Sequence, residues 1–239
     1  MVQTRQLKFI FPNLITAMNI ACGFFGILLA SQGRIDAAIV FIFFAGIFDM
    51  LDGKTARLLD ATSEFGIQFD SFSDALSFGM APAYILYQSS LYELGLLGML
   101  ACLFFLLMGV IRLTRFNIYT QRGEKNDFFY GFPIPASAAY LVSFILMREY
   151  LPPQIGAIYA ILFGLLMVSN FRLPNFKNKN LSWKYQAVGV VNSFVFMVVA
   201  TTQEGPWPWR LFIWWNAYNL FVIFLNYRFI RRTHVSMSG

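Results

Sequence analysis

Charged residues are scarce in this sequence. They make up 13% of its 239 residues, whereas soluble domains contain about 25%, and hydrophobic residues make up 58%. The shortage of charge excludes an ordinary soluble domain and predicts a membrane protein. The net charge of +6 does not indicate nucleic acid binding, because in a membrane protein the positions of Lys and Arg matter more than their total.

Cysteine and histidine are also nearly absent. Cys22 and Cys102 both lie within apolar runs, so we predict that they are small core residues. Two such cysteines exclude a disulfide framework and do not indicate a metal site. The single histidine, His234, lies in the basic C-terminal tail, where we expect it to be solvated.

Long apolar runs alternate with short polar segments along the whole chain. A helix that spans a membrane needs about 20 mostly apolar residues. We therefore predict an all-α polytopic membrane protein with about eight transmembrane helices. The predicted spans are 10–31, 36–58, 66–90, 94–116, 133–149, 153–171, 185–203 and 209–229.

The Lys and Arg residues predict the orientation, because positive charge favours the cytoplasmic side of a membrane. With eight spans and a cytoplasmic N-terminus, only Arg34, Arg148 and Arg210 of the 18 Lys and Arg residues lie outside. Removing one helix from this arrangement would place a basic loop outside. We predict an integral protein of the cytoplasmic (inner) membrane, with both termini and residues 49–74 on the cytoplasmic side.

Half of the acidic residues lie in one stretch, DMLDGKTARLLDATSEFGIQFDSFSD (49–74), between two apolar segments. Asp49 and Asp52 are three residues apart, and Asp70 and Asp74 are four apart, so each pair shares a helix face. Carboxylates within transmembrane segments are costly and usually functional. We predict that these four converge near the membrane surface.

The other residues of this stretch have different predicted roles. Asp60 and Glu64 are expected to be solvated, as acidic residues near helix ends usually are. Gly53 and Gly66 flank the turn and would let two helix ends approach closely. Converging carboxylates repel one another unless a cation compensates them, and oxygen ligands suit Mg²⁺, Mn²⁺ or Ca²⁺. Four carboxylates suffice for two ions, an arrangement that assists displacement at phosphorus.

The stretch resembles the signature of the CDP-alcohol phosphatidyltransferases. All eight signature residues are present at the expected spacing, Asp49-x2-Asp52-Gly53-x2-Ala56-Arg57-x8-Gly66-x3-Asp70-x3-Asp74. Other stretches resemble the phosphatidylserine synthase branch of the family, namely PNLITAMN (12–19), SDALSFGMAPA (73–83), IRLTRFN (111–117) and GFPIPASA (131–138). The resemblance implies a six-helix core over residues 1–180 and a two-helix extension over residues 181–239.

The resemblance also implies the roles of the aspartates. In the family, the four motif aspartates bind a pair of divalent cations that hold the diphosphate of a CDP-linked lipid. The implied metal ligands here are Asp49, Asp52, Asp70 and Asp74, with Mg²⁺ or Mn²⁺ as the cations and Ca²⁺ as an alternative. Asp74 is also the implied general base on the acceptor hydroxyl.

The implied binding site for the CDP-lipid combines motif residues with the first helix. Gly53, Ala56 and Gly66 would leave room for the nucleotide, and Arg57 would pair with motif carboxylates or substrate phosphate. The first-helix segment resembles the one that lies beside the nucleotide in the family. The full implied set is Asn13, Thr16, Asp52, Gly53, Ala56, Arg57 and Gly66.

The acceptor is predicted less directly than the donor. Free L-serine carries a carboxylate, which an arginine can hold with two hydrogen bonds. Arg112 and Arg115 end the fourth predicted span and are our candidates, although each could equally be ordinary flanking charge. Asn117 is a candidate for a hydrogen bond to the nucleotide or the acceptor. A phosphorylated alcohol would require more basic residues near the cleft. Because the sequence offers few beyond Arg57, Arg112 and Arg115, it favours a small zwitterion as the acceptor.

We therefore predict an enzyme that moves the phosphatidyl group of CDP-diacylglycerol to the hydroxyl of L-serine by metal-assisted direct displacement. One alternative is the same chemistry on inositol phosphate, glycerol 3-phosphate or choline. Another is a cation-coupled transporter, but a transporter usually binds near the midplane and often has inverted repeats, which this sequence does not show. Membrane lipids and a second copy of the chain are expected partners, and nucleic acid is not.

Overall fold

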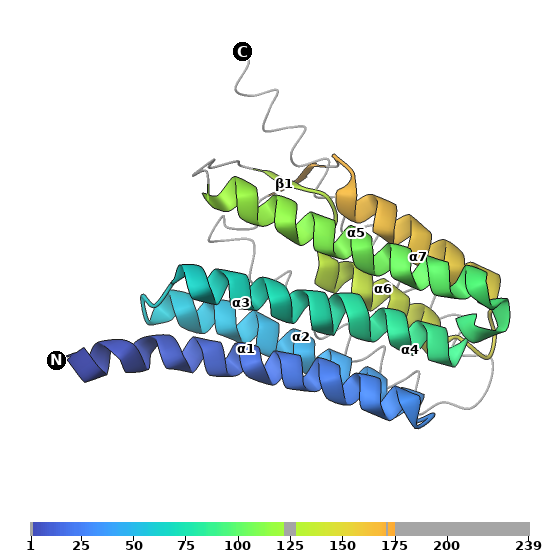
Figure 1. The fold of residues 1–239 in the computed structure, drawn as a ribbon, viewed down its shortest axis with the longest axis horizontal. Helices are drawn as coiled ribbons and strands as arrows, with labels where there is room; N and C mark the ends of the chain where they lie inside the picture. The colour runs from blue at the N-terminus through green and yellow to red at the C-terminus, as the bar shows by residue number, and fades with distance from the viewer. Residues whose placement is uncertain (1, 122–127, 171, 175–239) are drawn as a thin grey trace, which may run out of the picture. The chain divides into compact units, whose positions relative to one another are not determined.

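The computed structural model describes residues 2–121, 128–170 and 172–174, which belong to two compact units (Figure 1). The first unit covers residues 1–124 and 133–168, and its described part is helical. Its elements are α1 (Val2–Ser31), α2 (Ile35–Leu58), α3 (Glu64–Asp74), η1 (Ala75–Met80), α4 (Ala81–Ser89), η2 (Leu91–Leu94), α5 (Leu96–Gln121), α6 (Ile134–Leu146) and α7 (Pro153–Val168).

The second unit covers residues 125–132 and 169–239. Its described part contains two short strands, β1 (Phe128–Tyr130) and β2 (Arg172–Pro174). They pair in antiparallel register, with Phe129 opposite Leu173.

A tight turn folds α2 back against α1, and Figure 1 shows the two helices side by side. Gly33 adopts a φ of 76°, which glycine reaches without steric cost. Its N–H donates to the carbonyl of Ala30, and the N–H of Arg34 donates to the carbonyl of Leu29, each at 2.9 Å. These bonds satisfy the last carbonyls of α1. The result is an antiparallel hairpin whose open end carries the motif residues of α2.

The helices α3, η1 and α4 follow one another without interruption and lie in line in Figure 1. Ser63 caps the start of α3, since its hydroxyl accepts a hydrogen bond from the N–H of Gly66 at 3.0 Å. The π-helical segment η1 begins directly after Asp74. Such π-helical turns occur frequently at functional sites.

Two helices of the described part are long and apolar enough to cross a membrane. Lys8–Ser31 in α1 and Leu96–Tyr119 in α5 meet this test, while α6 and α7 are shorter apolar helices. Only 33% of the apolar window in each long helix is buried inside the structure. Large apolar side chains such as Phe25 on α1 and Leu103 on α5 are exposed. Exposed apolar surface on this scale indicates contact with lipid or with another protein.

The first six predicted spans correspond to described helices. The fourth predicted span corresponds to α5, which continues to Gln121 beyond the predicted end at 116. The third predicted span, 66–90, is divided into α3, η1 and α4. The described residues are mainly helical, as predicted, but the short β1–β2 pair was not expected. Cys22 and Cys102 are buried and free, which confirms their predicted role as core residues. The spans 185–203 and 209–229, and the boundary at 180/181, lie outside the described residues.

Candidate active site

Three motif aspartates from two helices meet in the first unit. Asp49 lies in the C-terminal half of α2, and Asp70 and Asp74 lie on α3. One carboxylate oxygen from each of these residues lies within 4.8 Å of the others. We call Asp49, Asp70 and Asp74 the aspartate cluster. The helical spacing of Asp70 and Asp74 aims both toward α2, as predicted.

The aspartate cluster has buried oxygens that the protein does not satisfy. The Oδ1 atoms of Asp70 and Asp74 are buried and have no hydrogen-bond partner among the described residues. Burying carboxylates together is costly unless a positive charge compensates them. The donor set is entirely carboxylate oxygen, which is the chemistry that Mg²⁺ and Mn²⁺ prefer. The residues present therefore fit a divalent cation.

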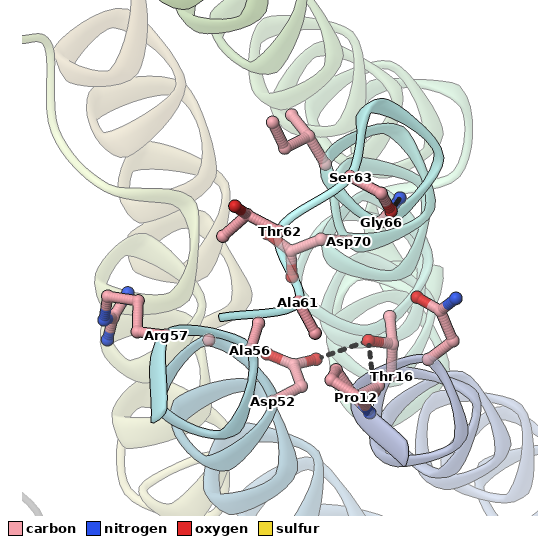
Figure 2. Close-up of a pocket in the computed structure, with 13 residues that line it drawn as sticks. Pro12, Thr16, Asp52, Ala56, Arg57, Ala61, Thr62, Ser63, Gly66 and Asp70 are labelled. Carbon is pink, nitrogen blue, oxygen red and sulfur yellow. Dashed lines mark hydrogen bonds between the residues drawn. The ribbon is translucent and has the colours of Figure 1, made fainter. Parts of the chain in front are cut away.

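Asp52, the fourth motif aspartate, lies beside the aspartate cluster and bonds to α1. Thr16 Oγ1 donates to Asp52 Oδ2 at 2.8 Å, and the same hydroxyl lies 3.1 Å from the carbonyl oxygen of Pro12 (Figure 2). Asp52 is buried, with 4% of its surface exposed. We predicted that four aspartates would converge; the structure brings three of them together and places Asp52 beside them. A role for Asp52 as a metal ligand stays a prediction.

A cavity of about 190 Å³ adjoins the aspartate cluster. Asp70 belongs to both, so the cavity opens next to the carboxylates. All seven residues predicted to bind the CDP-lipid line this cavity, although their role in binding remains a prediction. The complete lining is Pro12, Asn13, Thr16, Asp52, Gly53, Ala56, Arg57, Ala61, Thr62, Ser63, Gly66, Ile67 and Asp70.

The absence of a side chain at Gly66 leaves one wall of the cavity open. A Cβ atom built on Gly66 would lie 3.2 Å from Ser63 Oγ and 3.5 Å from Asn13 Oδ1. A larger residue would therefore crowd two polar groups of the lining. At Gly53, an added Cβ would lie 3.5 Å from the guanidinium of Arg57, so this arginine folds back across the glycine at the edge of the cavity.

Arg112 on α5 lies beside the aspartate cluster, which matches its predicted position at the aspartate cleft. It is close enough to Asp74 and Asp49 to interact with both electrostatically. Its guanidinium stands 5.7 Å from the ring centre of Phe116. The buried Nε atom has no hydrogen-bond partner among the described residues. Arg112 thus brings positive charge and a spare donor to the cluster.

The other two candidates for acceptor binding have partners within the protein. Arg115 donates from Nη1 to the carbonyl oxygen of Val168 at 2.9 Å, at the C-terminal end of α7. Asn117 Nδ2 lies 3.2 Å from Gln68 Oε1 and 3.0 Å from Ser71 Oγ, so it ties α5 to α3. These contacts describe structural roles. Binding of an acceptor by either residue stays a prediction.

Some residues at the site were missed by the sequence reasoning. The lining residues Pro12, Ala61, Thr62, Ser63 and Ile67 were not proposed. The Ser-Glu pair at 63–64 is typical of a helix start and would have placed Ser63 at the cap of α3. Asn19 was also missed, although polar residues recur every third position from Asn13 through an otherwise apolar helix. This repeat of polar residues is the feature of the sequence that could have identified Asn19.

Comparison with known proteins identifies the family. The sequence model of the CDP-alcohol phosphatidyltransferases matches residues 9–171. The chain belongs to this family. The match covers α1 from Phe9 onward and all the helices from α2 to α7, and it confirms the resemblance found in the sequence.

Several curated relatives cover most of the chain. The CDP-diacylglycerol–serine O-phosphatidyltransferase of Helicobacter pylori is 38% identical over 203 residues, which are 82% of this chain and 84% of that protein. The protein of the same name from Methanocaldococcus jannaschii is 42% identical over 168 residues, 70% of this chain and 75% of that protein. The archaetidylserine synthase of Methanothermobacter thermautotrophicus is 36% identical over 165 residues, 68% of this chain and 69% of that protein.

Proposed function

We propose that this chain transfers the phosphatidyl group of CDP-diacylglycerol to the hydroxyl of L-serine, which yields phosphatidylserine and CMP. The observation that carries the proposal is the junction at Asp70, where the aspartate cluster meets a cavity lined by the motif residues. The names of the relatives support serine as the acceptor.

The cavity is the proposed site for the nucleoside end of the donor. Its volume of about 190 Å³ is below the roughly 300–1,000 Å³ typical of pockets that enclose a whole ligand. We therefore assign it to part of the donor, with the diphosphate extending past Asp70 toward the aspartate cluster. Asn13 offers an amide for the base or ribose. Arg57, at the exposed edge, offers positive charge for phosphate.

Asp49, Asp70 and Asp74, with Asp52 beside them, would hold two divalent cations, Mg²⁺ or Mn²⁺. Bound there, the cations would neutralise the diphosphate and the charge that develops on CMP as it leaves.

The protein's own groups supply the remaining steps. Asp74 accepts the proton of the serine hydroxyl, because a neutral hydroxyl is a weak nucleophile without a base. The hydroxyl oxygen forms a bond to the lipid-side phosphorus, and the bond from that phosphorus to the oxygen of CMP breaks. Arg112 holds the serine carboxylate beside the reacting hydroxyl.

Direct displacement is favoured over a covalent intermediate on the enzyme. Ser71 and Ser73, which adjoin Asp70 and Asp74 in the sequence, already have structural partners. Ser71 Oγ lies 3.2 Å from Asn117 Oδ1, and Ser73 Oγ lies 3.4 Å from the carbonyl oxygen of Thr16. No histidine among the described residues can serve either hydroxyl as a base, since the only histidine in the sequence, His234, lies outside them.

The membrane setting is part of the proposal. We infer that the helices from α1 to α7 form a six-span core and that residues 181–239 add two more spans. The aspartate cluster and both termini face the cytoplasm, where L-serine is dissolved, while the donor reaches the site from the lipid. Light scattering of the purified protein tests the homodimer that the family resemblance implies.

An acceptor panel tests this function. The full-length protein in liposomes that contain CDP-diacylglycerol is given serine, inositol phosphate, glycerol 3-phosphate or choline, with and without Mn²⁺, and the lipid product is identified by mass spectrometry. We expect phosphatidylserine and CMP only with serine and the cation. A preference for another alcohol would overturn the acceptor. Failure to release CMP with any alcohol would overturn phosphatidyl transfer itself.

A further inference from the structure

Asn19 on α1 is a fully buried amide in the helix packing near the aspartates. Its exposed fraction is 0%, and neither Nδ2 nor Oδ1 has a hydrogen-bond partner among the described residues. Unpaired buried polar atoms are costly, and the few that folded proteins keep call for an explanation. None of the site roles assigned above uses this amide.

The register of α1 against α2 places Asn19 at the level of Asp49. The two helices are antiparallel, and the bond from Thr16 to Asp52 fixes how they align. Asn19 follows Thr16 by three residues, so it lies one turn further along the same face of α1. Asp49 precedes Asp52 by three residues, so it lies one turn back on the facing side of α2. Asn19 therefore opposes Asp49 as Thr16 opposes Asp52.

Contacts with α3 and η1 fix the main chain of Asn19 close to the level of the aspartate cluster. Ser77 Oγ on η1 donates to the carbonyl oxygen of Asn19 at 2.9 Å. One turn earlier, Ser73 Oγ lies 3.4 Å from the carbonyl oxygen of Thr16. The two contacts show that α1 runs parallel to α3 and η1, with Asn19 less than one turn beyond Asp74. The amide is thus at the inner end of the aspartate cluster.

We propose that Asn19 is a positioning residue whose amide N–H groups donate to the carboxylate of Asp49 in the cation-loaded site. This inference rests on the proposed function, because it assumes that the aspartate cluster binds divalent cations. An amide supplies two donors, and an ionised carboxylate only accepts. Thr16 already provides such a donor to Asp52 from the same face of α1. Asn19 repeats that arrangement one turn deeper.

Hydrogen bonds to metal-binding carboxylates affect affinity directly. Loss of such a partner typically weakens metal binding about 10- to 100-fold. A residue that only fills space between α1 and α2 would instead change the thermal stability and leave cation affinity unchanged. The two roles are therefore separable by measuring binding and unfolding on the same variants.

Binding of Mn²⁺ alone to the full-length protein in detergent, followed by electron paramagnetic resonance of the free ion, tests the proposal. Asn19→Leu removes the amide and keeps a side chain that branches at Cγ, and Asn19→Ala removes both. Cys22→Ala is the matched control, because Cys22 is buried on the next turn of α1 and is not part of the site. We expect both Asn19 variants to bind Mn²⁺ about 10-fold more weakly or worse, while the control binds it as the wild type does.

The outcomes separate this inference from the proposed function. If the wild type binds no Mn²⁺, the cation-dependent function fails and the role of Asn19 fails with it. If the wild type binds Mn²⁺ and either folded Asn19 variant binds it equally well, the positioning role is overturned while the proposed function stands. If neither Asn19 variant folds and Cys22→Ala does, the amide serves folding, and the positioning role is overturned as well.

Discussion

The hydroxyl of Thr16 donates to the carboxylate of Asp52 across 2.8 Å, and this bond joins residues 36 positions apart in the sequence. It fixes the register of α1 against α2, and it holds Asp52 in the wall of the cavity that Asp70 also lines (Figure 2). The pair thus connects the packing of two helices to the shape of the proposed donor site.

Removing this hydroxyl should weaken use of the donor. Thr16→Val keeps the side-chain shape but leaves a buried carboxylate oxygen of Asp52 without its donor. A hydrogen bond to a charged group contributes about 1.5–3 kcal/mol, so kcat/KM for CDP-diacylglycerol should fall roughly 10-fold or more. The measurement is CMP release across a range of donor concentrations. Thr16→Ser keeps the hydroxyl and should stay near the wild-type value; equal losses in both variants would contradict this explanation.

The two arginines of α5 should separate into different roles. Arg112→Ala should raise the KM for serine more than the KM for the donor, because Arg112 lies beside the aspartate cluster with an unpaired Nε. Serine and donor are each varied at saturating levels of the other substrate. Equal changes in both KM values would indicate a phosphate-binding role for Arg112.

Arg115→Ala should act on stability. Its guanidinium holds a carbonyl at the end of α7, and the loss of one such bond should lower the free energy of unfolding by about 1 kcal/mol. Thermal unfolding in detergent measures this effect. A large rise in the KM for serine with unchanged thermal unfolding would instead indicate that Arg115 binds the acceptor.

The helices of the described part could be predicted from the sequence because long apolar runs between short polar segments are typical of membrane helices. Two of them, in α1 and α5, are long and apolar enough to cross a membrane. The ends of the helices could not be read as reliably. The helix α5 continues past the apolar run to Gln121, since helical hydrogen bonding does not stop where the hydrophobic stretch ends. The β1–β2 pair escaped prediction because strands of three residues leave no clear period in the sequence.

The sequence predicted part of the residues that line the candidate site but not how they are arranged. Helical spacing correctly indicated that Asp49 and Asp52 share a face of α2, yet it could not show which neighbour each one meets. The neighbour of each aspartate depends on the register of α1 against α2, which places the hydroxyl of Thr16 within hydrogen-bond distance of Asp52. The buried amide of Asn19 was invisible for a similar reason, since its lack of a partner is a property of packing.

The contact between α3 and α5 should depend on Asn117. Its amide bonds to Ser71 and Gln68 on α3. Asn117→Ala should lower the free energy of unfolding by about 1 kcal/mol, the usual size of such bonds in proteins, including between membrane helices. Ser71→Ala and the double variant complete a mutant cycle, and thermal unfolding of all four proteins measures the coupling. Additive effects would contradict a direct bond, and a selective rise in the KM for serine would support the acceptor role instead.

The proposed general base can be tested at Asp74. Asp74→Asn keeps the size of the side chain and removes its ability to take a proton. General-base assistance typically contributes 10²- to 10⁴-fold, so CMP release should fall by about 100-fold or more. Stabilisation against unfolding by CDP-diacylglycerol measures whether the variant still binds the donor, which we expect.

Asp60→Asn is the control: Asp60 is exposed, and its φ of 48° is one that asparagine adopts readily. It should leave the rate unchanged. A near-normal rate for Asp74→Asn would remove Asp74 as the base. A loss of donor binding in that variant would show that the role of Asp74 as a cation ligand for the donor diphosphate, and not proton transfer, accounts for the fall in rate.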